Sequence, residues 1–146
     1  MSVARVLLGF DYGKRRIGIA VGQELTATAT PAETIHSTAA GPDWDAISRL
    51  IKTWQPQALV VGLPRNMDGT EHELADAARE FGDTLHERYG LPVYWIDERL
   101  SSVEAQHMLA ETAPYPRRLA GRHKDDVDKV AAQVILQTWL AQPPVK

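Results

Sequence analysis

The sequence predicts an α/β protein with a mixed five-stranded sheet and helices on both of its faces. Two apolar runs, Val6 to Asp11 and Ile17 to Val21, flank a short polar segment, which is typical of an antiparallel hairpin. Further along the chain, apolar runs of strand length alternate with segments of helical periodicity. Such βα units add parallel strands to a sheet, so an antiparallel start with parallel additions is expected.

The remaining strands differ in how exposed they should be. Ala29 to Ile35 is a weaker strand that Pro31 confines to an edge, because proline donates no hydrogen bond to a neighbour. Ala58 to Leu63 is apolar throughout, as expected of a central strand covered on both faces. Val93 to Ile96 completes the sheet.

Each predicted helix has a recognisable start. The first runs from about Trp44 to Trp54, with Asp43 as its N-cap. Thr70 and Glu73 form a capping box for a second helix that ends near Gly90. A third helix begins near Ser101 and ends at about residue 111, and a last one ends at about residue 141. Residues 112–124 read as a long mobile basic loop.

Length and composition fit one domain spanning residues 1–146. The chain has 146 residues, 44% of them hydrophobic and 24% charged. It has no cysteine, which excludes disulfides and thiolate zinc sites, and its five histidines show no metal-ligand spacing. The N-terminus resembles neither a signal peptide nor a membrane span, so a cytoplasmic protein without membrane partners is expected.

Acidic residues at three distant places predict a divalent-metal site. They are Asp11 at the end of the first strand, the pair Asp97 and Glu98 after the fifth, and Asp128 in the last helix. A cluster of carboxylates repels itself and needs a cation. The alternatives are a turn residue for Asp11 and a helix-entry pair for Asp97 and Glu98.

Helical geometry separates Asp128 from the two acids before it. At about 100° per residue, Asp128 lies about 60° from the centre of the predicted buried face, whereas Asp125 and Asp126 lie more than about 100° away. Those two are explained as residues that stabilise the helix start. The buried face is predicted from Val127, Ala131, Val134 and Ile135.

Basic residues close to these acids suit a phosphodiester substrate. The formal net charge of −3 argues against a general nucleic-acid coat. Local clusters nevertheless form a basic rim around an acidic centre, although solvated loop charges are an equal alternative. The clusters are Lys14, Arg15 and Arg16, then Arg117 and Arg118, then Arg122, His123 and Lys124.

Four motifs, in order along the chain, resemble the YqgF/RuvX family. They are Phe10-Asp11-Tyr12-Gly13 with Arg16 to Val21, Val61 to Pro64 with Asn66 to Thr70, Asp97 to Ser101, and Val127-Asp128 before Ala131-Ala132. The resemblance runs from about residue 5 to about residue 140. It implies a ribonuclease H-like fold, and bacterial members are described as pre-16S rRNA nucleases or Holliday-junction-resolvase-like proteins.

The resemblance also implies an activity and its residues. Asp11, Glu98 and Asp128 match the family's acidic positions, which implies Mg²⁺- or Mn²⁺-dependent hydrolysis of phosphodiesters and selects Glu98 over Asp97. Arg16, Asn66, Arg99 and Ser101 are implied as substrate contacts, with Ser101 equally explained as a helix cap. Lys14 departs from the small hydroxyl residue of many relatives, so its contact is expected with the substrate backbone.

The substrate and the assembly remain open at this level. Precursor 16S rRNA, processed during ribosome maturation, is the leading substrate, and ribosomal particles are candidate partners. A Holliday-junction resolvase acting on DNA shares the chemistry, and a noncatalytic ribosome-assembly factor would share the fold. An actin-like ATPase is disfavoured because those proteins enclose the nucleotide between two such domains. Both monomer and homodimer are compatible with the sequence.

Overall fold

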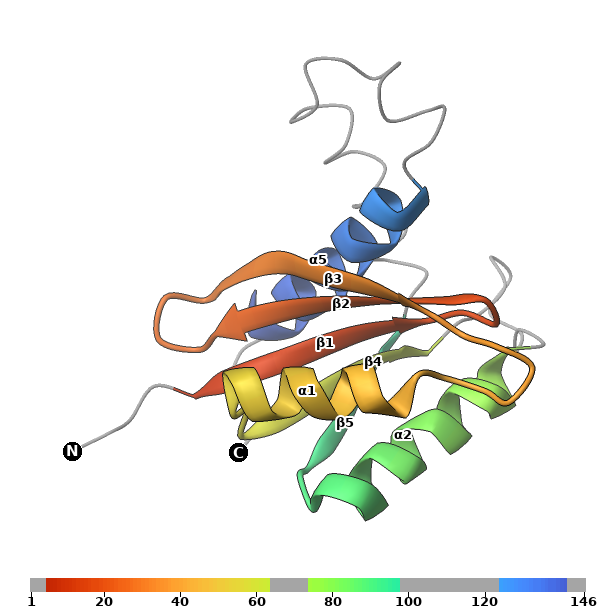
Figure 1. The fold of residues 1–146 in the computed structure, drawn as a ribbon. Coiled ribbons are helices and arrows are strands. Elements are labelled where there is room, and N and C mark those ends of the chain that lie inside the picture. Colours follow the sequence, from red (N-terminus) through yellow and green to blue (C-terminus); the bar gives the residue numbers. More distant parts are fainter. Residues whose placement is uncertain (1–4, 64–73, 98–123, 142–146) are drawn as a thin grey trace.

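The computed structural model describes residues 5–63, 74–97 and 124–141 (Figure 1). These residues form a five-stranded sheet with helices on both faces, which confirms the predicted architecture. None of the described helices is long and apolar enough to cross a membrane. In chain order the elements are β1 (Val6–Tyr12), β2 (Arg16–Gln23), β3 (Thr28–His36), α1 (Trp44–Trp54), β4 (Ala58–Leu63), α2 (Ala75–Tyr89), β5 (Val93–Asp97) and α5 (Lys124–Ala141).

The order of strands in the sheet is β3-β2-β1-β4-β5. β1 pairs antiparallel with β2 and parallel with β4, and β4 pairs parallel with β5. The hairpin start and the parallel additions are therefore confirmed. Because β1, β4 and β5 run in the same direction, their carboxyl ends meet at one edge of the sheet, where such folds place their sites.

The edge strand β3 shows the expected effect of proline. Its register against β2 shifts between Ile19 and Ala20, so that Ile19 lies opposite Glu33 and Ala20 lies opposite Pro31. The residue between Pro31 and Glu33 is an extra one, as in a β-bulge. The bulge lets a residue without an N–H lie in the strand without breaking the rest of the ladder.

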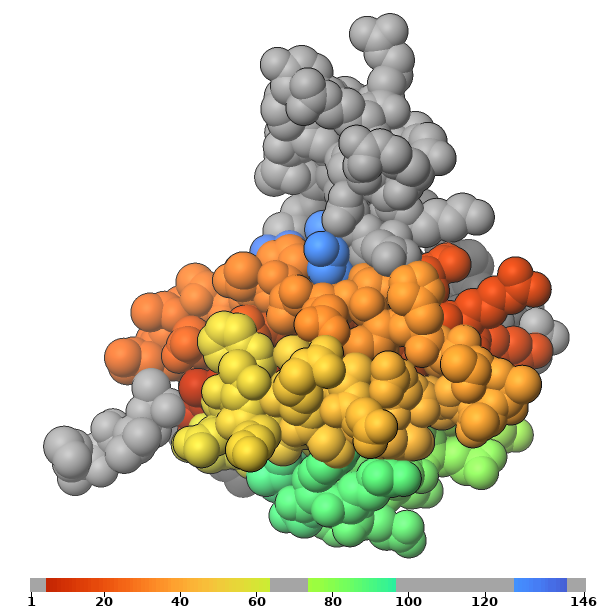
Figure 2. Space-filling view, viewed as in Figure 1, coloured from red at the N-terminus to blue at the C-terminus, as the bar shows by residue number. Residues whose placement is uncertain are grey.

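Two apolar layers enclose the sheet. α1 and α2 cover one face and α5 covers the other (Figure 1). The space-filling view shows α1 lying across the front, between β3 above it and α2 below it (Figure 2). Alternate residues of each strand serve the two layers, so Leu8 and Phe10 of β1 face α1 and α2, and Leu7 faces α5.

The helix boundaries agree with the sequence in α1 and differ in α2. The side chain of Asp43 accepts a hydrogen bond from the Ala46 N–H at 3.1 Å, so the predicted N-cap of α1 is confirmed. α2 begins at Ala75, five residues after the predicted cap Thr70, and Leu74 precedes it without a side-chain cap. Gly90, with φ of 66°, ends α2 as predicted. The capping box itself and the helix predicted from Ser101 lie outside the described residues.

Glycines on β1 and β2 let α5 approach the sheet closely. A Cβ added at Gly9 would lie 2.8 Å from Leu136 Cβ, and one added at Gly22 would lie 2.7 Å from Leu136 Cδ2. A Cβ added at Gly18 would collide with the backbone carbonyl of Asp128. No residue with a side chain fits at Gly18 unless α5 moves.

The buried face of α5 agrees only in part with the predicted one. Val134 and Ile135 are buried as predicted and Ala132 and Leu136 are buried as well, whereas Ala131 is only half-buried. The buried face is therefore rotated toward the positions four and seven residues after Asp128. Asp128 therefore faces the sheet more directly than the helical periodicity predicted. The glycines of β1 and β2, rather than the apolar residues of α5, determine which side of the helix lies on the sheet.

The glycine contact gives a stability prediction. Gly18→Ala should lower the free energy of unfolding by about 1–3 kcal/mol, because the new methyl group meets backbone that cannot rotate away. Gly22→Ala is the matched control on the same strand, since it meets the flexible ends of Leu136 and Leu140. Urea denaturation of both variants checks this, and equal losses would contradict it.

Candidate active site

Asp11 lies near the carboxyl end of β1, on the face covered by α5. It pairs with Gly18 of β2 in the ladder. Gly9, two residues earlier, is on the face toward α5, because a Cβ added there would meet Leu136. Residues two apart in a strand share a face, so Asp11 is on that face as well. Asp11 is half-buried, so its carboxylate is positioned at the margin of this layer with access to solvent.

Asp128 reaches the same place from the other end of the chain. Its backbone carbonyl lies directly over Gly18, the residue opposite Asp11. Its side chain is 21% exposed. Two of the three predicted acids, 117 positions apart in sequence (128 − 11), therefore converge on one glycine.

Arg16 supplies a positive charge to this pair of acids. Its Nε donates a hydrogen bond to Asp128 Oδ2 at 2.6 Å, and the two side chains are 30% and 21% exposed. Arg16 and Gly18 are two residues apart on β2, so they share the face toward α5. The family resemblance implied only a substrate contact for Arg16, and not its ion pair with Asp128. The same i, i+2 spacing, on the strand opposite Asp11, was the available signal for its contact with the acids.

The chemistry of these side chains fits a hard divalent cation. Two of the described side chains at the site are carboxylates, and the Asp128 carboxylate is paired with the Arg16 guanidinium. Carboxylate oxygens are the ligands that Mg²⁺ and Mn²⁺ prefer. Within residues 5–63, 74–97 and 124–141, no three acidic, histidine or cysteine side chains lie close enough to hold an ion. Of the three predicted acids, Asp11 and Asp128 lie within the described residues and Glu98 lies outside them.

The end of β5 approaches the same edge of the sheet. Ile96 packs in the apolar layer beneath α5, on the same face as Asp11. Asp97, the last residue of β5, is in register with Leu63, the last residue of β4. The acidic pair predicted from sequence thus begins where the parallel strands end.

Three of the other predicted substrate contacts lie within the described residues. Lys14 and Arg15 are exposed in the β1–β2 turn, and the Ser37 N–H donates to the Arg15 carbonyl at 2.8 Å. Lys124 is the first residue of α5. The structure therefore places a basic turn just beyond Tyr12, the last residue of β1. Asn66, Arg99, Ser101 and Arg122 lie outside the described residues.

The ion pair between Arg16 and Asp128 should stabilise the protein measurably. A double-mutant cycle with Arg16→Gln and Asp128→Asn should give a coupling energy of about 1 kcal/mol, because the pair is partly buried and hydrogen-bonded. Urea denaturation of the four proteins measures it. A coupling energy of zero would show that the pair does not hold α5 to β2. The same cycle with Arg49 and Glu33, an exposed pair at 3.3 Å, is the control and should give less.

Comparison with known proteins identifies the family. A family model described as RuvX, Holliday junction resolvase, matches residues 5–142. A protein of Nitrosococcus oceani with the name "Putative pre-16S rRNA nuclease" is 50% identical over 141 residues, covering 97% of this chain and 90% of that protein. A protein of Aeromonas hydrophila with the same name is 49% identical over 139 residues, covering 95% of this chain and 96% of its own length.

A solved structure supports the fold. The structure described as T. thermophilus RuvC in complex with Holliday junction substrate matches with a TM-score of 0.55 and 18% sequence identity, and the match covers 93% of each chain. At this identity the likeness shows the fold, which is ribonuclease H-like as the family resemblance implied. The match of the family model over most of the chain, together with relatives of about half-identical sequence, shows that the chain belongs to the RuvX family of nucleases, hydrolases that act on ester bonds.

Proposed function

We propose that this nuclease hydrolyses phosphodiester bonds of precursor 16S rRNA with Mg²⁺ or Mn²⁺ held by Asp11, Glu98 and Asp128. The observation that carries the proposal is the convergence of Asp11 and Asp128 on Gly18 at the carboxyl edge of the sheet. Glu98, which lies outside the described residues, is included because it matches the third acidic position of the family that the chain resembles. The names of the half-identical relatives supply the substrate.

Each residue of the site has a task in this proposal. Asp11 and Asp128 hold the ion, and Arg16 orients the Asp128 carboxylate from the side of β2. Lys14 and Arg15 attract the phosphates that flank the scissile bond, because their exposed side chains lie three and four residues after Asp11 in the β1–β2 turn. When bound, a divalent ion lowers the pKa of a water molecule and stabilises charge on the leaving oxygen.

A four-way DNA junction is the second candidate substrate. The family model is described by that activity, and the fold is shared with a junction resolvase. A noncatalytic assembly factor is the alternative of another class. We place the protein in the cytoplasm, acting on precursor rRNA either free or in ribosomal particles, as a monomer or a homodimer.

Cleavage assays test the proposed function. Asp11→Asn, Glu98→Gln and Asp128→Asn should each slow cleavage of precursor 16S rRNA more than about 100-fold, since even residues that only support metal ligands cost about 10- to 100-fold. Asp45→Asn is the matched control, because it removes the same charge from the exposed first turn of α1. Asp97→Asn tests the choice between the neighbouring acids.

The outcomes separate the candidate functions. Each protein is assayed with Mg²⁺, Mn²⁺ or a chelator, on precursor 16S rRNA and on a four-way DNA junction, after circular dichroism has shown that it is folded. Cleavage of the junction alone would favour the resolvase. Undiminished cleavage by folded Asp11→Asn would sink the proposed site, and the absence of any metal-dependent cleavage by the wild type would favour the assembly factor.

Arg16 should weaken metal binding, because its guanidinium competes with the ion for Asp128. Arg16→Gln is therefore expected to bind Mn²⁺ severalfold more tightly than the wild type in calorimetric titration. Arg15→Gln removes the same charge from the exposed neighbour and is the matched control. An equal increase in Mn²⁺ affinity in the two variants would mean that only the overall charge of the turn matters. That result would disprove competition between Arg16 and the ion for Asp128.

A further inference from the structure

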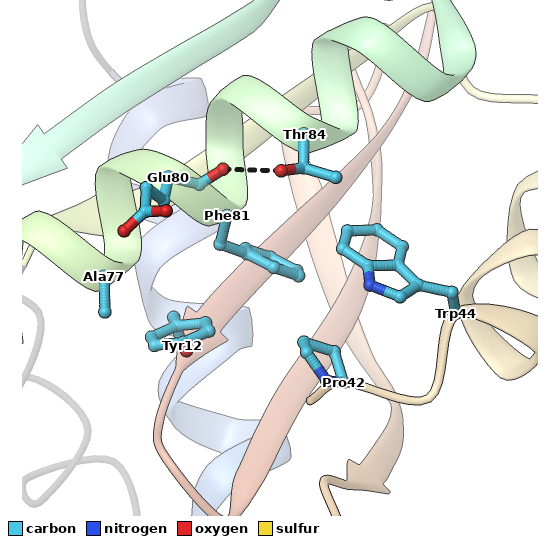
Figure 3. A pocket seen from close by; sticks show the side chains of 7 residues that line it. All are labelled: Tyr12, Pro42, Trp44, Ala77, Glu80, Phe81 and Thr84. Atoms are coloured by element: carbon cyan, nitrogen blue, oxygen red, sulfur yellow. Dashed lines mark hydrogen bonds between the residues drawn. The ribbon is translucent and has the colours of Figure 1, made fainter. Parts of the chain in front are cut away.

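A hollow lies on the other face of the sheet, at the same end of β1 as the acids (Figure 3). Its volume is about 210 Å³, smaller than the roughly 300–1,000 Å³ of pockets for drug-sized ligands, so it suits a single ring system. The rings of Tyr12, Trp44 and Phe81 surround it, together with Pro42 and the side chains of Glu80 and Thr84.

The three rings are arranged around Phe81. Its ring centroid lies 5.1 Å from that of Tyr12 and 5.5 Å from that of Trp44, with the Trp44 ring stacked at an interplanar angle of 29°. Phe81 is buried, whereas Tyr12 and Trp44 are half-buried and leave ring surface open to the hollow. Arg88 lies 4.4 Å above the Trp44 ring centroid and steadies it. The hollow is therefore walled in part by aromatic ring surface.

Its position links the hollow to the acids. Tyr12 directly follows Asp11, and neighbouring residues of a strand face opposite sides of the sheet. The exposed Lys14 and Arg15 lie just beyond, and the Arg15 carbonyl is bonded to the Ser37 N–H at the start of the segment that leads to Pro42. A nucleic-acid strand held at Asp11 can pass this basic turn and reach the hollow.

We propose that the hollow binds one unpaired base of the nucleic-acid strand whose phosphodiester lies at Asp11. This inference rests on the proposed function of the acidic site. Aromatic side chains bind bases by stacking, which is tolerant of sequence. The carboxylate of Glu80 repels a phosphate and accepts hydrogen bonds from the amino groups of adenine, cytosine and guanine, which uracil lacks. The occupant is thus a base, and amino-bearing bases bind better than uracil.

The pocket gives the enzyme a specificity. A base in a duplex is stacked and paired, so it enters the hollow only after extrusion from the helix, whereas an unpaired base enters freely. Cleavage is thus directed to phosphodiesters close to an unpaired, amino-bearing nucleotide. Regular duplex on both sides of the scissile bond is a poor substrate.

A fluorescent base tests the pocket directly. The probe is an oligouridine RNA with a single 2-aminopurine, mixed with the full-length protein in the presence of a chelator so that no cleavage occurs. Stacking quenches 2-aminopurine, so the wild type should quench it. Ala77→Leu places a larger side chain in the hollow from α2 and should weaken the affinity about tenfold or more, from the usual contribution of a stacked base.

Matched variants separate the pocket from general effects. Trp44→Leu should weaken quenching as Ala77→Leu does, whereas Trp54→Leu, at the far end of the same helix, should leave it unchanged. Glu80→Gln should reduce the preference for 2-aminopurine over uridine, and Glu87→Gln, two turns along α2, should not. Circular dichroism confirms that each variant is folded.

The result is independent of the metal site. The quenching assay contains a chelator and involves no cleavage, so its outcome does not depend on whether the acidic site is active. Quenching that is absent in the wild type, or that persists at full strength in folded Ala77→Leu, would overturn the pocket whatever the outcome of the cleavage assays. Loss of quenching in Ala77→Leu and Trp44→Leu alone supports it, even if Asp11→Asn still cleaves RNA.

Discussion

The contact of α5 with the hairpin at Gly18 is the constraint on which the rest of the site depends. Because Gly18 has no side chain, the backbone of Asp128 can lie directly on β2, opposite Asp11. The ion pair of Arg16 with Asp128 joins the same two elements. A helix from the end of the chain and a hairpin from its start are thereby held together at the place where Asp11 and Asp128 both adjoin Gly18.

The sequence was sufficient for the fold because local signals agreed with tertiary structure. The apolar run of β4, the proline in β3 and the Asp43 cap each specify one element, and the structure confirms all three. The predicted start of α2 was wrong, because the helix begins at Ala75 and the residue before it, Leu74, has no capping side chain that the sequence could have shown. The phase of α5 was also imprecise, because apolar residues occur on several sides of that helix and the glycines across the interface decide which side is buried.

The candidate site was predictable only in part. Asp11 and Asp128 were expected to meet, and the structure brings them to one glycine. Alternation along β2 indicates the face on which Arg16 lies, but its partner Asp128 is 112 residues away in sequence and no local pattern identifies it. The aromatic hollow is a similar case: Tyr12, Trp44 and Phe81 come from three elements, and each alone is an ordinary core residue. The end of β1 thus serves two faces, with acids on one and rings on the other.

Anomalous diffraction from crystals grown with Mn²⁺ tests the central claim most directly. The account predicts a manganese peak beside Gly18, within coordination distance of the Asp11 and Asp128 carboxylates, with Glu98 as a further ligand. It also predicts that Asp128→Asn removes or weakens the peak while α5 stays on β2. A peak at other residues, or the two carboxylates facing apart with the ion bound by only one of them, would contradict the account.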